Sequence, residues 1–348
     1  MRFEVQRAPA QRDRELMLIL GGAGFFKAVV AAHELHLFKY LRDRPGSTPE
    51  DLSQGLSLPL PSVRTLLMAC AALRFVERDS SGRYQNAAWV SGAFAGPTPT
   101  FTALIEGFDR LLYQPLFRLT EALQRGTNVG LQYFPGTGGT LYERLAGHPA
   151  LEATFHAWMS NLSALGLPRR LMEALTDRRW VLDVGGGDGT NAILIARANP
   201  EVRVTVLDLP SVCERAQARI AAEGLQGRID TQAMDIRVDP FPSGCDAVLF
   251  SRIFNIYSEA QNQSFVSRAA ACLAPGGRLL VFPSMVADDD ETGPLSAAML
   301  SLYYLCLATG EGRVYAPRDY EGWFQAAGFT SLECVVDERD DAVLIGEK

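Results

Sequence analysis

The segment from Val181 to Gly189 most constrains the fold that this chain can adopt. An apolar strand ends at Val184 and runs directly into the turn Gly185-Gly186-Gly187-Asp188-Gly189, and an apolar helical run follows at 192–196. Glycines allow a tight turn and let the backbone approach a ligand without an intervening Cβ. The pattern predicts a Rossmann-like doubly wound α/β sheet whose ligand binds at the carboxyl ends of the strands.

Two acidic residues narrow the choice of ligand. A second apolar run, 202–207, ends in Asp208, where a carboxylate can bind ribose hydroxyls. A dinucleotide-binding loop needs a third glycine, which here falls on Thr190. Asp183 would repel a pyrophosphate but could pair with the ammonium of an amino-acid tail. These features favour S-adenosylmethionine, and the alternative is a sheet domain with a glycine turn and an ordinary surface aspartate.

Over nearly its whole length the chain resembles the class I, S-adenosylmethionine-dependent small-molecule O-methyltransferases of the plant caffeate and bacterial antibiotic-pathway type. The resemblance is carried by Asp183 to Gly189, Leu207 to Pro210, Met234 to Ile236, Asp246 to Arg252, Leu273 to Val281 and Gly322 to Phe329. It implies that the cofactor is bound by Asp183, Gly185, Gly187, Asp208, Leu209, Asp235, Ile236 and Ser251. Residues 171–348 would form this S-adenosylmethionine-binding domain.

The N-terminal part, about residues 10–95, has the pattern of a mainly helical domain with a hairpin wing. The helix expected over 61–73 would be the recognition helix of a winged helix-turn-helix, but Arg64 is its one basic residue. A helix that reads DNA needs basic and polar residues facing the groove, and the net charge of −7 also argues against nucleic acid. In the resembled family this domain dimerises, which implies a homodimer.

Composition excludes several other classes of protein. The six cysteines contain no C-x-x-C pair, which favours free thiols in a reducing cytoplasm over a disulfide framework. Neither a signal peptide nor a run of about 20 apolar residues is present, so no membrane association is expected. The acidic run 288–291 has the pattern of a solvated loop, and no metal site is predicted.

Aromatic residues are frequent in the segment 96–170, which we expect to hold connecting helices and a substrate wall. Phe155, Trp158 and Met159 lie in an apolar helical stretch, and Tyr304 is a further substrate-lining candidate. Ordinary helix packing is the alternative for any one of them. Their density favours a flat, apolar acceptor, such as a small hydroxylated aromatic, over a sugar.

The catalytic position departs from the resembled family. Members usually carry a histidine base after the fourth strand, and Asn255 stands there in this chain. Asparagine cannot accept a proton at neutral pH, although it can hydrogen-bond a substrate. Residues 157–348 contain no histidine, and Gly312 replaces the supporting glutamate of the family. Arg252 and Asn255 are expected to face the acceptor.

Three explanations of the missing base are open. In the first, the reaction needs little base, as when an activated ring carbon attacks the methyl group directly. In the second, another group is the base, with His156, Glu311, Tyr257 and Tyr304 as candidates. In the third, the fold serves a reaction or a binding function without methyl transfer. The absence of the histidine favours ring C-methylation over phenol O-methylation, in specialised biosynthesis of the antibiotic type.

Overall fold

The computed structural model describes residues 11–93, 100–145, 147–164, 167–287, 292–336 and 342–348. The chain divides into two compact units, Met1–Leu111 and Leu112–Lys348. The second unit holds the large sheet, together with the glycine turn that follows one of its strands.

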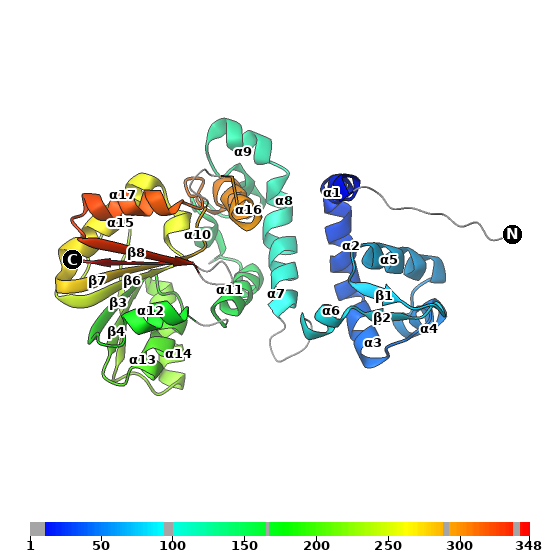
Figure 1. The fold of residues 1–348 in the computed structure, drawn as a ribbon, viewed down its shortest axis with the longest axis horizontal. Helices are drawn as coiled ribbons and strands as arrows, with labels where there is room; N and C mark the ends of the chain where they lie inside the picture. The colour runs from blue at the N-terminus through cyan, green and yellow to red at the C-terminus, as the bar shows by residue number, and fades with distance from the viewer. Residues whose placement is uncertain (1–10, 94–99, 146, 165–166, 288–291, 337–341) are drawn as a thin grey trace. The chain divides into compact units, whose positions relative to one another are not determined.

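The first unit is helical with one hairpin (Figure 1). Thr48 caps the fourth helix through a capping box with Asp51, as expected for a hydroxyl followed by proline and acids. Around it, Leu52, Leu67 and other apolar side chains form one core. The elements are α1 (Gln11–Leu20), α2 (Gly22–Glu34), α3 (Leu37–Asp43), α4 (Pro49–Leu56), α5 (Leu60–Ala72), β1 (Val76–Arg78), β2 (Tyr84–Asn86), α6 (Ala88–Ala93) and α7 (Thr100–Gly107).

The second unit is built on a seven-stranded sheet with the order β5-β4-β3-β6-β7-β9-β8. All neighbouring strands are parallel except β9, which runs antiparallel to both β7 and β8. The strands are β3 (Trp180–Val184), β4 (Arg203–Asp208), β5 (Ile229–Ala233), β6 (Cys245–Ser251), β7 (Leu273–Ser284), β8 (Ser331–Val336) and β9 (Ala342–Glu347). The sequence-based α/β prediction is therefore confirmed.

Helices cover both faces of this sheet (Figure 1). Alternate residues of one strand enter different cores: Leu182 packs with the helices on one face, and Val181 packs on the other. One face is covered by α15 (Glu259–Cys272) and α17 (Pro317–Ala326), and the other by α12 (Arg169–Ala174), α13 (Thr190–Ala198) and α14 (Pro210–Ala222). Burial on both faces explains why these strands are almost continuously apolar in the sequence.

Shorter helical segments precede the sheet or connect its strands. The helical stretch over 100–125 is interrupted by a π-helical segment. These segments are η1 (Phe108–Tyr113), α8 (Gln114–Leu116), α9 (Leu119–Arg125), η2 (Val129–Tyr133), α10 (Leu141–Leu145), α11 (Pro149–Ala164), η3 (Phe254–Ile256), α16 (Leu295–Tyr303) and η4 (Tyr304–Ala308). Within the described residues no single helix is long and apolar enough to cross a membrane, although two bent helix pairs in the first unit meet the same test jointly.

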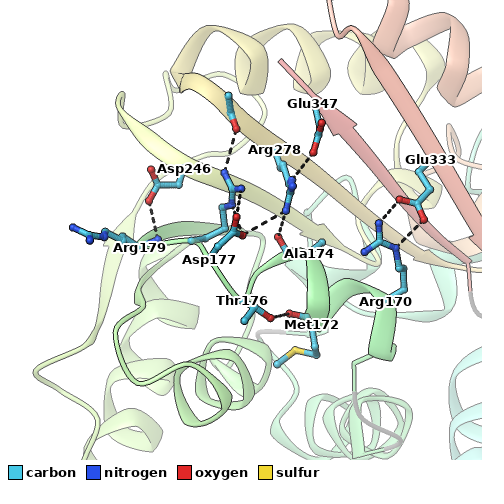
Figure 2. A network of polar contacts seen from close by, with 12 residues as sticks. Arg170, Met172, Ala174, Thr176, Asp177, Arg179, Asp246, Arg278, Glu333 and Glu347 are labelled. Atoms are coloured by element: carbon cyan, nitrogen blue, oxygen red, sulfur yellow. Dashed lines mark hydrogen bonds and ion pairs between the residues drawn. The ribbon is translucent and has the colours of Figure 1, made fainter.

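Hydrogen bonds and ion pairs of charged side chains connect the amino-terminal ends of the parallel strands (Figure 2). The guanidinium of Arg278 contacts the carboxylates of Asp177 and Glu347 and donates to the Ala174 carbonyl at 3.1 Å. The carboxylate of Asp246 accepts the backbone N–H groups of Arg179 and of the next residue, each at 2.8 Å. These contacts anchor the starts of strands and leave the opposite, carboxyl edge for ligands.

Candidate active site

The glycine turn lies at the carboxyl end of β3 and is packed tightly against its neighbours. Gly185 has φ of +69°, and a Cβ there would lie 2.4 Å from Cδ1 of Ile253. A Cβ on Gly186 would lie 2.7 Å from the Asp183 carboxyl carbon. The turn therefore needs glycine both for its left-handed backbone and for lack of space.

Asp183 is the least satisfied charged group of this site. Its side chain is fully buried, and neither carboxylate oxygen has a hydrogen-bond partner among the described residues. Burial, with smaller contributions from Asp208 and Asp188, raises the pKa of Asp183 to about 7. A buried carboxylate without partners destabilises the folded protein. A ligand that supplies a hydrogen-bond donor or a positive charge would therefore be bound favourably at this position. An amino-acid ammonium has both properties and fits this position.

Asp208 connects the glycine turn to the end of β4. One carboxylate oxygen accepts the Gly187 N–H at 2.9 Å, and the other accepts the Leu209 N–H at 2.7 Å. Burial raises the pKa of Asp208, while these two hydrogen bonds and the charge of Arg215 oppose that shift. Since both N–H groups belong to the turns that border the site, the carboxylate holds the two turns together.

The loop after β5 is held from two directions. Asp235 accepts hydrogen bonds from the backbone and guanidinium of Arg237, which lower its pKa. From α15, Arg268 donates to the carbonyl of Ile236 at 2.7 Å. On the neighbouring β6, Ser251 is buried at the last position of the strand. All of the predicted cofactor residues therefore lie at or just after the carboxyl ends of four neighbouring parallel strands.

Arg252 follows β6 directly and has a backbone conformation that is rare for residues other than glycine. Its φ is +60°, and its N–H donates to the Phe282 carbonyl at 2.7 Å. The guanidinium carbon lies 5.3 Å from the centre of the Phe282 ring. Such backbone strain persists where the surrounding structure enforces it, and it is frequent at functional sites.

Asn255 lies inside the protein, within η3. Its side chain is fully buried, its amide nitrogen donates to the Pro283 carbonyl at 3.0 Å, and its amide oxygen accepts the Tyr320 hydroxyl at 3.3 Å. Gly312 packs against it so closely that a Cβ would lie 2.1 Å from the Asn255 carbonyl oxygen. The two positions that differ from the family pattern are thus in direct contact, and a side chain at position 312 would meet the backbone of Asn255 and Ile256.

Aromatic side chains from three segments form a cluster beside this position. Phe155 lies with its ring centre 6.4 Å from that of Trp158, which in turn lies 6.1 Å from Tyr303. The Tyr303 ring lies 5.1 Å from Tyr304, and its hydroxyl oxygen lies 3.5 Å from that of Tyr142. Tyr142 and Tyr303 are missed by the sequence-based prediction, because no motif marks them. Met159, which that prediction includes, is half-buried on the same helix as Trp158.

His156 points to the partly exposed side of α11. Its Nε2 lies 3.5 Å from the carboxylate of Glu152, and 40% of its side chain is exposed. The same carboxylate oxygen accepts a hydrogen bond of 2.7 Å from Arg215 on α14. These contacts link α11 to the helix that follows Asp208.

Among the described residues no three or more His, Cys, Asp or Glu side chains gather as metal ligands would. The acidic run 288–291 lies outside the described residues. None of the six cysteines forms a disulfide, and five of them are buried.

Comparisons with known proteins agree with this geometry. Residues 117–330 match the O-methyltransferase domain family, and residues 17–93 match the O-methyltransferase dimerisation domain. The chain is 33% identical over 317 residues to L-tyrosine C(3)-methyltransferase of Streptomyces lavendulae, covering 90% of this chain and 86% of that protein. It is also 33% identical over 313 residues to 3-hydroxy-5-methyl-1-naphthoate 3-O-methyltransferase of Streptomyces sahachiroi, covering 89% and 87%.

A solved structure supports the same conclusion. The apo form of the S-adenosylmethionine-dependent methyltransferase SibL superposes with a TM-score of 0.83 at 36% identity, over 96% of this chain and 98% of that one. The fold and site therefore define an S-adenosylmethionine-dependent methyltransferase. The chain belongs to the O-methyltransferase family, whose small-molecule enzymes of antibiotic pathways it resembles.

Proposed function

We propose that this enzyme methylates a small hydroxylated aromatic compound, at a ring carbon next to the hydroxyl, in specialised biosynthesis. The observation that carries the choice of carbon is the buried Asn255, which stands at the position of the family's usual histidine base and has protein partners at both ends of its amide. Carbon attack requires an electron-rich ring more than it requires a base at the hydroxyl. The relative that methylates L-tyrosine at C3 supports this choice.

Cofactor binding is proposed for the residues at the carboxyl edge of the sheet. Asp183 would accept the ammonium of the amino-acid tail, and Asp208 would accept ribose hydroxyls while holding the adjacent turns. The remaining cofactor contacts are assigned to Gly185, Gly187, Leu209, Asp235, Ile236 and Ser251. When bound, S-adenosylmethionine supplies an electrophilic methyl group, and the protein supplies alignment and a site from which water is excluded.

The acceptor is proposed to lie against Phe155, Trp158, Met159 and Tyr304, with Arg252 close to its oxygen. Asn255 has protein partners at both ends of its amide, so we assign it a positioning role in catalysis. Phenol O-methylation is the second candidate function, and His156, paired with Glu152, is its candidate base. The relative that acts as a naphthoate 3-O-methyltransferase favours that alternative.

The protein is proposed to form a homodimer through a winged-helix domain in its first unit. We also propose that the chain has three parts, residues 10–95, 96–170 and 171–348. Exposed apolar side chains on α1, including Met17, Ile19 and Leu20, support an interface. Light scattering of the purified chain should give twice the mass of one protomer. Location in the cytoplasm is a proposal that rests on the lack of a disulfide among the six cysteines, all of which the structure describes.

Methyl transfer can be followed with S-adenosylmethionine that carries a carbon-13 methyl group. The enzyme is incubated with L-tyrosine, other phenolic amino acids, catechols and aminophenols, and the products are identified by carbon NMR. We expect an aryl-methyl resonance. A methoxy resonance would overturn the carbon assignment, and transfer to no phenol, despite measurable cofactor binding, would overturn the class of acceptor.

A further inference from the structure

The buried residue Tyr304 lies next to Asn255. Asn255 itself occupies the position at which members of the family usually have their histidine base. Tyr304 is the first residue of η4, and 9% of it is exposed. Burial raises the pKa of Tyr304 well above its ordinary range, and the neighbouring Tyr303 adds to this, whereas Arg252 and a hydrogen bond with Asn255 oppose it. A phenol of this kind stays protonated at neutral pH, so it can donate a hydrogen bond but cannot act as a base.

The contacts of Asn255 bear on which hydrogen bond the Tyr304 hydroxyl can accept and which one it can donate. The amide oxygen of Asn255 accepts the Tyr320 hydroxyl, so its nitrogen lies on the other side and donates one hydrogen to the Pro283 carbonyl. Asn255 then has one amide hydrogen left that can donate to the hydroxyl oxygen of Tyr304. Within the described part of the chain, no contact provides an acceptor for the hydrogen of Tyr304 itself. That hydrogen is available to a ligand.

A positive charge acts at the same place. Arg252 follows β6 with a left-handed backbone, and its guanidinium carbon lies 5.3 Å from the centre of the Phe282 ring. The positive charge of this guanidinium lowers the pKa of Tyr304. A hydroxyl donor beside a cation stabilises an oxyanion in a site of low polarity. The aromatic cluster of Tyr142, Trp158 and Tyr303 borders Tyr304 and would hold the ring of that oxyanion.

We propose that the Tyr304 hydroxyl donates a hydrogen bond to the phenolic oxygen of the acceptor, with Asn255 as its positioning residue, and so directs the methyl group to the adjacent ring carbon. This inference rests on the proposed function and assigns the residue that recognises the acceptor. The phenol loses its proton to water and binds as the phenolate. The ring carbon forms a bond to the methyl carbon while the bond from that carbon to sulfur breaks, with its electron pair going to sulfur. After release into solvent the methylated ring loses its hydrogen to water and its oxygen takes up a proton, which restores the phenol, so one proton is released in total.

Oxygen methylation is disfavoured in this arrangement because the lone pairs of the phenolate are occupied by donors. Removing the Tyr304 hydroxyl should therefore change the position of methylation as well as its rate. A residue with only a structural role would lower the rate without moving the label from carbon to oxygen. This difference makes the product ratio a specific measure of the proposed hydrogen bond.

The test uses Tyr304→Phe and Asn255→Ala in the full-length enzyme, with the carbon-13 label and the phenol that the wild-type enzyme methylates best. We expect kcat to fall about 100-fold in Tyr304→Phe, as for loss of one oxyanion donor. The ratio of O-methyl to C-methyl product should rise, and affinity for S-adenosylmethionine should not change. Asn255→Ala should shift the ratio in the same direction. Unchanged kcat and product ratio in Tyr304→Phe would overturn the proposal while leaving the proposed function intact.

A binding measurement tests the same hydrogen bond without turnover. 4-Nitrophenol is titrated against pH in the presence of S-adenosylhomocysteine, and its phenolate absorbance gives the pKa of the bound probe. We expect Tyr304→Phe to raise that pKa by about one unit, the equivalent of one lost hydrogen bond. Tyr315→Phe is the matched control, because it removes a buried hydroxyl that donates to the Tyr257 carbonyl at 2.6 Å in the same unit. No binding of the probe to the wild-type enzyme, or an equal pKa in both proteins, would overturn the inference.

Discussion

The cofactor end of the proposed site is assembled from turns and carboxylates at the ends of neighbouring strands, whereas the acceptor end is assembled from side chains of distant helical segments. Asp183 and the glycine turn are separated by one residue, and Asp208 binds the turn through backbone N–H groups. Asn255, by contrast, depends on Pro283, Tyr320 and Gly312. The comparison teaches that turns at strand ends can be recognised from short sequence patterns, whereas the acceptor end depends on which distant segments meet.

The largest effect is expected from Asp183→Asn at the cofactor end. The pKa of about 7 in the folded state exceeds the ordinary value of 3.8. Between these values the folded, cofactor-free chain holds a proton that the unfolded chain has lost, so stability falls as pH rises. The loss reaches about 4 kcal/mol above pH 7. Asp183→Asn should remove this decrease and weaken S-adenosylmethionine binding by more than about tenfold.

Urea denaturation without cofactor at pH 5 and pH 8 should show about 2.7 kcal/mol of this loss, because only the part above pH 5 is measured. Asp230→Asn is the control, because Asp230 pairs with Arg203 on the exposed side of neighbouring strands. An equal change of stability with pH in the wild-type and Asp183→Asn proteins would contradict the buried, unpartnered carboxylate.

Asp208→Ala tests whether the cofactor end depends on its joined turns. The substitution leaves the N–H groups of Gly187 and Leu209 without their acceptor and removes the proposed ribose ligand. We expect the Kd for S-adenosylmethionine to rise about 100-fold, equivalent to about 2.7 kcal/mol. Isothermal titration calorimetry gives the value, with Asp230→Ala as the control. Retained affinity would mean that the ribose site is placed wrongly.

Gly312→Ala tests the close packing of the acceptor end. The new Cβ would lie 2.1 Å from the Asn255 carbonyl oxygen and 2.6 Å from the Ile256 carbonyl group, and backbone atoms cannot move aside freely. We expect a loss of about 2 kcal/mol in the free energy of unfolding. In Gly227→Ala, where nothing lies within 4 Å, stability should be nearly unchanged. Similar unfolding midpoints for both variants would refute the close packing at Gly312.

Glu152→Gln concerns the ion pair that links α11 to the cofactor end, and its effect should be the smallest. Arg215 is 40% exposed, so solvent screens the pair, and we expect a loss of about 0.5 kcal/mol. Urea denaturation measures it, beside Glu173→Gln, whose partner Arg169 is almost fully exposed. A loss well above about 1 kcal/mol would show that α11 depends on this contact more than surface ion pairs usually allow.

Some of the architecture could be predicted because it depends on short-range patterns. The run from Val181 to Val184 predicts β3, and Thr48 with Pro49 predicts the start of α4. The π-helical form of η1 could not be predicted, because Gly107 precedes it and Pro115 follows it but neither residue by itself specifies a π-helical turn. The site residues Tyr142 and Tyr303 carry no motif, and only their contacts with Phe155, Trp158 and Tyr304 single them out.

By itself the sequence determined the class of fold, the cofactor and the absence of histidine after residue 157, because strand periodicity, glycine turns and residue identity are local properties. Tertiary structure alone decided that Asp183 is without a partner and that Asn255 is enclosed by Pro283 and Tyr320. Burial and hydrogen-bond partners depend on which distant segments meet. In an open site the amide of Asn255 could bind a substrate, whereas here Pro283 and Tyr320 are its partners.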